Sequence, residues 1–369
     1  MGRAIAWELL HRHSGVGLER RLDPDVVESA CLAHDLGHPP FGHNTERELD
    51  SLLWNPDQPE ASLFDGFEGN AQTFRVVTKT AIKYQADEDA PGLNLTAATL
   101  NAILKYPVTQ DDPDKRRTKW GYYLSEKEDF AFARSTMPGP ESDAPSLEAD
   151  IMNIADDITY AVHDVEDFFR AGLLPLDAVA SNSAERDWFL RRTTLDPKRT
   201  SAVLDKIILL RFQGVHANFA QLAEFRSSTV NRFIHGIGIA LTGKGPTLSV
   251  ADHVAFEIAV LKDLTRAYVI ESPAVQSRRY GQRRMIRTLF TIFLEEATKP
   301  ADTIAERRRH LQIFPPLYRE LIEQLDSSDV SAIKRTIADL IASMAEQQAI
   351  DTFAKLTGQI QGSVIEPIV

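Results

Sequence analysis

Apolar residues recur at intervals of three and four along most of the chain, while runs in which apolar and polar residues strictly alternate are scarce. The first spacing places apolar side chains on one face of an α-helix, whereas alternation is typical of a half-buried strand. We therefore predict an all-α protein. The run from Thr247 to Val250 could form a short strand, which is too short to change this class.

Two helices are predicted with clear boundaries. Asp23 and Pro24 supply an N-cap followed by a proline at the first helical position, and Gly37 ends this first helix together with the two prolines that follow it. The second helix runs from Glu148 to Ala171 and ends before Gly172, a residue suited to a helix C-terminus. The first helix therefore places the residues just after it on an irregular loop, where backbone can wrap a ligand.

One short segment, 33–46, concentrates groups that bind metals and transfer protons. Three of the chain's ten histidines fall in it, beside an aspartate and a glutamate. These groups are His34, Asp35, His38, His43 and Glu46. Imidazole nitrogen and carboxylate oxygen suit Mg, Mn, Fe or Co, so the segment predicts a metal site of open identity. A structural alternative exists for the adjacent His-Asp pair, in which a histidine favoured by the helix dipole stands beside a solvated aspartate.

A second group of polar residues lies on the predicted helix 148–171. Asp156, Tyr160 and Asp164 recur every four residues, so they lie along one stripe of that helix. Apolar residues surround this stripe in the sequence, and carboxylates in such a setting suggest a ligand. For Tyr160 the alternative is a core aromatic residue whose hydroxyl is satisfied.

Composition narrows the class of protein. The net charge of −12 argues against broad, non-specific attraction to nucleic acid or to an anionic membrane. Cys31 is the single cysteine, which excludes an intramolecular disulfide and fits a reducing compartment. No apolar run approaches the length of a membrane span. We therefore expect a cytoplasmic protein with no membrane partner.

Five ordered motifs in residues 30 to 170 resemble the deoxyguanosinetriphosphate triphosphohydrolase family of the HD-domain superfamily. They are Ala33 to Glu46, Gly66 to Gln72, Gly92 to Thr96, Lys105 to Pro107, and Ala155 to Asp167. The resemblance implies an HD-domain helical bundle over residues 1–250, and a C-terminal helical region, 251–369, packed on it. It also implies an oligomer, often a hexamer in the family.

The resemblance implies one divalent metal ion held by a His-Asp pair and a distant aspartate. These positions match His34, Asp35 and Asp156. The family's first metal histidine precedes the stretch matched by residues 2–6, so the resemblance predicts a chain that is truncated at its N-terminus. An inactive form that binds nucleotide or DNA is therefore one alternative to an enzyme.

In the family, a metal-polarised water attacks the α-phosphorus of a deoxynucleoside triphosphate and releases the deoxynucleoside and tripolyphosphate. A histidine oriented by a carboxylate can manage the protons of such a step, and His43 with Glu46 is the predicted pair. His38 would lie near the phosphates as a second proton donor. The structural alternative for each histidine is a loop pinned by hydrogen bonds. The alternative enzyme is an HD phosphohydrolase that acts on another nucleotide.

The remaining matched residues are predicted to hold the substrate, and dGTP is the favoured substrate. They are Asn70, Lys105, Tyr106 and Lys119 for the triphosphate, Tyr160 and Asp164 for the deoxyribose, and Arg226 as a further phosphate contact. Lys115, Arg116 and Arg117 compete with Lys119. The basic cluster 278–287 reads first as a solvated helix face. The resemblance also implies three functional alternatives: the cluster could bind a regulatory deoxynucleoside triphosphate, contact another subunit or bind single-stranded DNA.

Overall fold

The computed structural model describes residues 1–15, 17–55, 57, 62–83, 92–110, 117–135, 137, 143–180, 184–207, 215–242 and 245–360. The chain forms two compact units, each built from segments far apart in the sequence. The first unit comprises Met1–Cys31 and Ser146–Ser277, and the second comprises Leu32–Pro145 and Arg278–Val369. Helices make up most of both units, which confirms the predicted all-α class.

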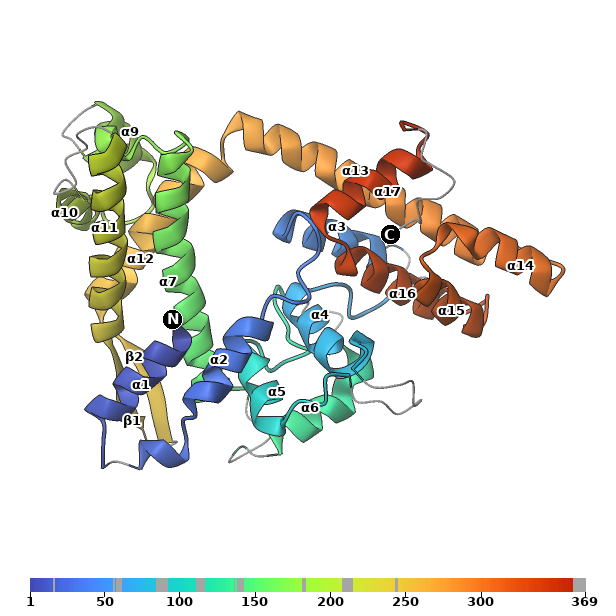
Figure 1. Ribbon diagram of the computed structural model, residues 1–369, viewed down its shortest axis with the longest axis horizontal. Coiled ribbons are helices and arrows are strands. Elements are labelled where there is room, and N and C mark those ends of the chain that lie inside the picture. The colour runs from blue at the N-terminus through green and yellow to red at the C-terminus, as the bar shows by residue number, and fades with distance from the viewer. Residues whose placement is uncertain are drawn as a thin grey trace. The chain divides into compact units, whose positions relative to one another are not determined.

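The first unit is organised around the long helix α7. Its helices are α1 (Gly2–Arg12), α7 (Leu147–Arg170), α8 (Leu176–Ala180), α9 (Ala184–Arg192), α10 (Pro197–Ile207), α11 (Val215–His235) and α12 (Asp252–Thr265), with short turns η1 (Leu18–Arg20) and η5 (Arg266–Ile270). The helix α2 (Pro24–Ala33) begins here. Figure 1 shows α7 and α11 side by side, and α7 also packs against α12 and α1.

Helix α7 matches its prediction closely. Ser146 caps it by accepting a hydrogen bond from the backbone N–H of Ala149, and Gly172 follows its end with a φ of +70°. Its predicted apolar face is buried: Ile151, Ile158 and Val162 are each 0% exposed within the core of this unit. Burial of this stripe holds α7 in place, so the polar stripe of the same helix has a fixed direction.

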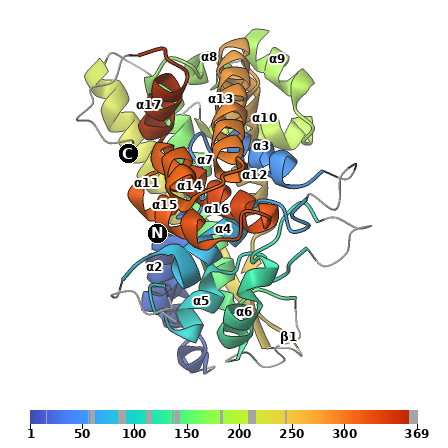
Figure 2. The ribbon, with the colours of Figure 1, turned by 90° about the vertical axis from the view of Figure 1, so that its right-hand side faces the viewer.

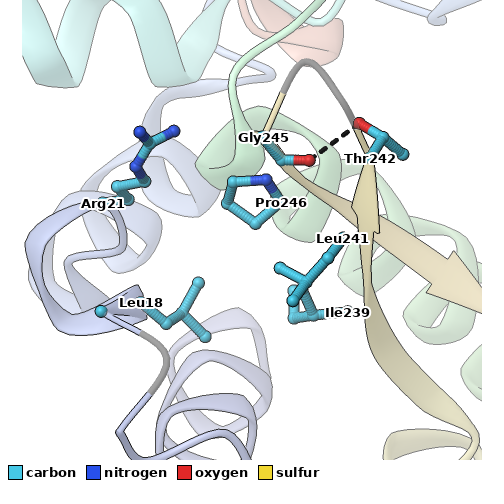
Figure 3. Close-up of a pocket in the computed structure, with 8 residues that line it drawn as sticks. Leu18, Arg21, Ile239, Leu241, Thr242, Gly245 and Pro246 are labelled. Carbon is cyan, nitrogen blue, oxygen red and sulfur yellow. Dashed lines mark hydrogen bonds between the residues drawn. The ribbon is translucent and has the colours of Figure 1, made fainter.

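The two strands form one antiparallel hairpin in the first unit. Strand β1 (Ile237–Thr242) pairs with β2 (Gly245–Val250), and Ile237 lies opposite Val250. The possible strand at 247–250 is thus real and longer than expected. Figure 3 shows a pocket of about 210 Å³ between this hairpin and the segment that carries Leu18 and Arg21. Among the described residues that line it, Arg21 is the one with a charged side chain.

The second unit contains the segment rich in histidine. Its helices are α3 (His43–Leu53), α4 (Gly69–Arg75), α5 (Ala97–Ile103), α6 (Lys127–Arg134), α13 (Pro273–Thr298), α14 (Ile304–His310), α15 (Pro316–Gln324), α16 (Val330–Ser343) and α17 (Glu346–Leu356), with short turns η3 (Val76–Thr80), η4 (Leu124–Glu126) and η6 (Leu311–Ile313). Figure 2 shows α5 beside α6, and α14, α15 and α16 gathered together. One apolar core joins α3 to α13 and α16.

The units differ from the predicted division into 1–250 and 251–369. Each unit combines an early and a late segment, because α13 and α16 pack on the core residues of α3. Whether 1–250 and 251–369 behave as separate domains stays a prediction. Across the described ranges, no helix is long and apolar enough to span a membrane.

Candidate active site

The His-Asp pair lies on the turn that follows α2. Asp23 begins this helix, as predicted, by accepting a hydrogen bond from the N–H of Asp25 at 2.8 Å. Past its end, the two carboxylate oxygens of Asp35 face two histidines: Oδ2 lies 3.4 Å from Nε2 of His34, and Oδ1 lies 3.1 Å from Nδ1 of His38. The hydrogen bond that Asp35 accepts raises the pKa of His38, and this effect is larger than the lowering of the pKa by burial.

Gly37 lets this turn lie directly on α4. Its backbone N–H donates to Oγ1 of Thr73 at 2.9 Å, and the same hydroxyl donates to the carbonyl of His34 at 2.8 Å. A Cβ atom at residue 37 would lie 2.0 Å from the backbone nitrogen of Thr73. The close approach therefore excludes any side chain here, and it fixes the main chain of both His34 and His38 against α4.

His43 and Glu46 form a hydrogen-bonded pair in the first turn of α3. His43 begins the helix, and its Nδ1 lies 2.9 Å from Oε2 of Glu46. The two side chains meet because residues three apart share a helix face. The imidazole is 64% exposed, while the carboxylate is 9% exposed. With Nδ1–H donating to Glu46, Nε2 carries the lone pair and can take or give a proton.

Lys119 ties Glu46 to a second carboxylate. Its Nζ donates to Oε1 of Glu46 and to Oε1 of Glu68, both at 2.7 Å. Burial opposes charge on both Glu46 and Lys119, but their partners outweigh it: His43 and Lys119 lower the pKa of Glu46 to about 2, and the carboxylates raise the pKa of Lys119. Glu46 therefore stays ionised beside His43 at neutral pH.

The other predicted triphosphate residues of this unit occupy neighbouring segments. Asn70, in the first turn of α4, donates its Nδ2 to Oε1 of Glu68 at 2.8 Å. Lys105 lies with its Nζ 6.0 Å from the ring centroid of Tyr106, and the Tyr106 carbonyl approaches Gly121, two residues beyond Lys119. The sequence motifs around Asn70, Tyr106 and Lys119 thus converge near the His43–Glu46 pair.

Arg117 does not share the position of Lys119. Its Nε donates to the carbonyl of Thr109 at 3.1 Å, so this side chain bonds within its own loop. The two other competitors, Lys115 and Arg116, lie outside the described residues. Lys119 is therefore the cation that the described part of this segment brings to Glu46.

The remaining predicted residues belong to the first unit. Asp156, Tyr160 and Asp164 follow one another along α7, as the four-residue spacing predicts. Tyr160 is 42% exposed, with Nζ of Lys262 lying 5.7 Å from its ring centroid. Burial raises the pKa of Asp164. Tyr160 is thus not a core aromatic residue, which removes the structural alternative for it.

Arg226 is held by a carboxylate on α7. Its Nη1 lies 3.2 and 3.0 Å from the two oxygens of Glu166, whose side chain is 2% exposed. Its predicted contact with phosphate, and the convergence of the α7 residues with His34 and Asp35, stay predictions.

Two groups of side chains in the second unit have the donor atoms for a metal ion. The first is His34 with Asp35, and the second is His38, His43 and Glu46, whose ligand atoms lie within 4.8 Å of one another. Both oxygens of Glu46 already accept hydrogen bonds, one from His43 and one from the Lys119 ammonium. A cation there would be repelled by Lys119. In contrast, Nε2 of His34 and Oδ2 of Asp35 lie 3.4 Å apart, a separation that fits two metal bonds of roughly 2.1 Å.

The basic cluster on α13 borders a separate cavity. Its volume is about 500 Å³, and it is lined by Glu48, Tyr280, Arg283, Arg284, Arg287, Thr288, Thr291 and Ile292. Nε of Arg287 donates to Oε1 of Glu48 at 2.6 Å, and Nδ2 of Asn44 donates to the carbonyl of Arg279 at 2.9 Å. The cluster is therefore a partly paired surface that contacts α3. A regulatory ligand at it stays a prediction.

Sequence reasoning missed Glu68 as a member of the site. Its side chain is 1% exposed, and it caps α4 by accepting hydrogen bonds from the N–H groups of Asn70 and Ala71. Glutamate is not among the residues that N-caps favour, so its capping role had little local signal in the sequence. Its bond to Lys119 had none, because that contact depends on packing.

Two protein families match this chain. The HD domain matches residues 2–161, and the phosphohydrolase-associated domain matches residues 248–355. The first match contains the segment 33–46 and the part of α7 up to residue 161, and the second contains α13 and α16.

Several relatives share the name deoxyguanosinetriphosphate triphosphohydrolase-like protein. The protein from Streptomyces coelicolor is 32% identical over 358 residues, which cover 91% of this chain and 78% of the relative. The protein from Corynebacterium efficiens is 32% identical over 372 residues, covering 94% and 81%. The protein from Bifidobacterium longum is 29% identical over 356 residues, covering 89% and 70%. The similarity therefore extends over both compact units.

Proposed function

Because the chain belongs to the deoxyguanosinetriphosphate triphosphohydrolase-like family of HD-domain phosphohydrolases, we propose that it hydrolyses deoxynucleoside triphosphates to deoxynucleoside and tripolyphosphate, with dGTP as the favoured substrate. The observation that carries the proposal is the His43–Glu46 pair, held by Lys119 in the same unit as the His-Asp turn. A proton-transfer pair and a metal-binding pair are the two parts that phosphate-ester hydrolysis requires.

We assign the metal to His34 and Asp35, with Asp156 of the first unit as the third ligand. The nitrogen and oxygen donors of the first two residues are turned toward each other and suit a divalent cation such as Mg, Mn, Fe or Co. When bound, such an ion neutralises phosphate charge and lowers the pKa of a water molecule. The carboxylate of Asp35 also faces His38, so it orients that imidazole toward the same site.

His43 manages the proton of the leaving group. When the bond between the α-phosphorus and the 5′-oxygen breaks, the oxygen needs a proton, and Nε2 of a protonated His43 can donate it. Glu46 fixes the ring through Nδ1 and stabilises its positive charge. Since the pKa of Glu46 is held at about 2, the carboxylate stays ionised while the imidazole gains and loses its proton.

Lys119 connects this pair to the triphosphate. An ammonium group has three N–H donors, and Glu46 and Glu68 accept two of them. The third is suited to a phosphate oxygen. Its charge also offsets part of the repulsion between the two carboxylates and a polyanionic substrate, which an acidic protein of net charge −12 must overcome locally. Asn70, Lys105 and Tyr106 are proposed to hold the same phosphates.

The α7 residues are proposed to recognise the sugar. Tyr160 would pack against the deoxyribose, where its ring fills the space of a 2′-hydroxyl, and Asp164 would accept a hydrogen bond from the 3′-hydroxyl. Arg226 would contact a phosphate from the position that Glu166 gives it. The exposure of Tyr160 supports this assignment, since an aromatic ring at 42% exposure has surface to offer a ligand.

The test is incubation of the chain with each deoxynucleoside triphosphate and Mg²⁺ or Mn²⁺, followed by ion-exchange separation of nucleoside, tripolyphosphate and pyrophosphate. Release of tripolyphosphate, greatly slowed in His43→Ala and retained in His253→Ala, is the expected result; His253 is an exposed histidine on α12. Release of orthophosphate or pyrophosphate would instead identify a phosphohydrolase of another class. Binding of nucleotide without any product would identify a binding protein.

A further inference from the structure

A chain of buried polar side chains runs from helix α16 to α4, within the second unit. Asp339 of α16 is 4% exposed, and its Oδ1 accepts hydrogen bonds from Nε2 of Gln72 at 2.8 Å and from Nε of Arg75 at 3.0 Å. Arg75 also donates to Glu126 at 2.7 Å. Two α4 side chains are therefore anchored by one carboxylate more than 260 residues away in sequence.

The chain continues from Gln72 to Tyr123. The Tyr123 hydroxyl lies 3.2 Å from Oε1 of Gln72, and it lies 3.4 Å from the backbone nitrogen and 3.3 Å from the carbonyl oxygen of Glu68. Tyr123 is fully buried, and the guanidinium of Arg335 lies 3.7 Å from its ring centroid. The guanidinium thus packs on the ring, while the hydroxyl bonds directly to the main chain of Glu68.

Glu68 links the Tyr123 hydroxyl to the proposed catalytic pair. Its backbone meets Tyr123, while its side chain accepts from Lys119, whose other carboxylate partner is Glu46. Every link is a direct hydrogen bond between buried or half-buried groups. A displacement of Glu68 by a few tenths of an ångström would therefore reach Lys119 and Glu46 without solvent to absorb it.

We propose that Gln72 and Tyr123, anchored by Asp339, are positioning residues that set the place of Lys119 and thereby of the His43–Glu46 pair. The proposal rests on the proposed function for the role of that pair. Asp339, Gln72, Tyr123 and Glu68 are called the positioning chain. It makes the C-terminal helical region part of the active-site machinery, although none of its residues touches the substrate.

In a purely structural interpretation, these hydrogen bonds contribute only to the stability of the fold. The branch through Arg75 fits that interpretation, because it ends on the carboxylates of Asp339 and Glu126. The branch through Gln72 differs, since it ends on the N-cap residue whose carboxylate holds Lys119. The two readings therefore predict different effects for removal of the Tyr123 hydroxyl.

The test variant is Tyr123→Phe, and the matched control is Tyr318→Phe. Both remove one hydroxyl oxygen, from a buried tyrosine in the first case and a half-buried one in the second. The Tyr318 hydroxyl donates to the backbone carbonyl of Asp339 at 3.2 Å, whereas the positioning chain starts from the side-chain carboxylate of Asp339. The first readout needs no turnover: the rate at which an acetylating reagent labels Lys119, followed by mass spectrometry. We expect labelling to speed up at least threefold in Tyr123→Phe, because Lys119 is released, and to stay unchanged in Tyr318→Phe.

The second readout is a double-mutant cycle on kcat with Lys119→Met. Tyr123→Phe alone is expected to lower kcat about fivefold to tenfold, the equivalent of one hydrogen bond. In the Lys119→Met background it should have no further effect, since the position it controls is already lost. A structural defect would multiply the two losses instead. Urea unfolding of each variant shows that the compared proteins are folded.

The outcomes separate this proposal from the proposed function. Unchanged Lys119 labelling in Tyr123→Phe, or multiplied losses of kcat, overturns the positioning chain. If Lys119 is labelled faster in Tyr123→Phe but the wild-type chain hydrolyses no deoxynucleoside triphosphate, the proposed function is overturned. The placement of Lys119 by Tyr123 then still stands.

Discussion

Gly37→Ala is expected to be the most damaging single-methyl change in the His-Asp turn. Its Cβ would lie 2.0 Å from the backbone nitrogen of Thr73, 2.4 Å from the carbonyl carbon of Gln72 and 2.7 Å from the carbonyl oxygen of Gly69. All three are backbone atoms of α4, so no side chain can rotate away. Ordinary contact begins at 3.4 Å, and the turn or α4 must therefore move by more than an ångström.

The cost follows from what that movement breaks. Overpacking of a tight interior typically costs about 1–3 kcal/mol. The shift also opens the hydrogen bonds that join Gly37 to Thr73 and Thr73 to His34, at roughly 1 kcal/mol each. We expect a total loss of about 3–5 kcal/mol in the free energy of unfolding. Displacement of His34 should also weaken metal binding.

Urea unfolding followed by circular dichroism measures the stability, and calorimetric titration with Mn²⁺ measures the metal affinity. The matched control is Gly281→Ala, at an exposed position inside α13 where a Cβ meets no atom within 4 Å. This control should raise stability by about 0.5–1 kcal/mol, because alanine loses less backbone entropy in a helix. Our reading of the turn is refuted if Gly37→Ala unfolds within about 0.5 kcal/mol of the wild type.

Three further outcomes are expected. Asp35→Ala should weaken Mn²⁺ binding at least about tenfold in calorimetric titration, with the circular dichroism spectrum unchanged, because the side chain is 60% exposed; equal affinity would remove Asp35 from the metal site. His43→Ala should slow turnover by about 10²–10⁴-fold while the dissociation constant for nucleotide stays similar, and loss of both would indicate a structural histidine. Burial raises the pKa of Asp150 from 3.8 to about 6. Between these pH values the folded state binds a proton that the unfolded state has lost, so the free energy of unfolding falls as the pH rises through them. Asp150→Asn should therefore be more stable at pH 8 by about 1–2 kcal/mol after allowance for partial exposure, and should lose the slope between pH 4 and 6; an unchanged slope in urea titrations would contradict the assignment.

Local features of the fold followed from the sequence with good accuracy. The N-cap of α2 at Asp23 and the limits of α7 agree with the prediction to within a residue or so, since caps and periodic apolar positions act within a few residues.

The candidate site divides in the same way. Spacing placed Asp156, Tyr160 and Asp164 along one stripe of α7, because residues four apart in a helix share a face in any fold. The pairing of His43 with Glu46 was also predicted, but from the chemistry of a histidine beside a carboxylate. That α3 begins at His43 and brings both side chains onto one helix face was not predicted, because His43 was expected on the loop after Gly37.

Other relations were decided by the packing of segments distant in the chain. Lys119 reaches Glu46 across 73 residues, and Gln72 reaches Asp339 across 267. No periodicity relates such positions, and Glu68 and Asp339 are acidic residues that composition would assign to the surface. Only burial by several helices at once turns them into partners. The sequence by itself determined which groups are proposed to carry the chemistry, and the tertiary structure decided which groups hold them in place.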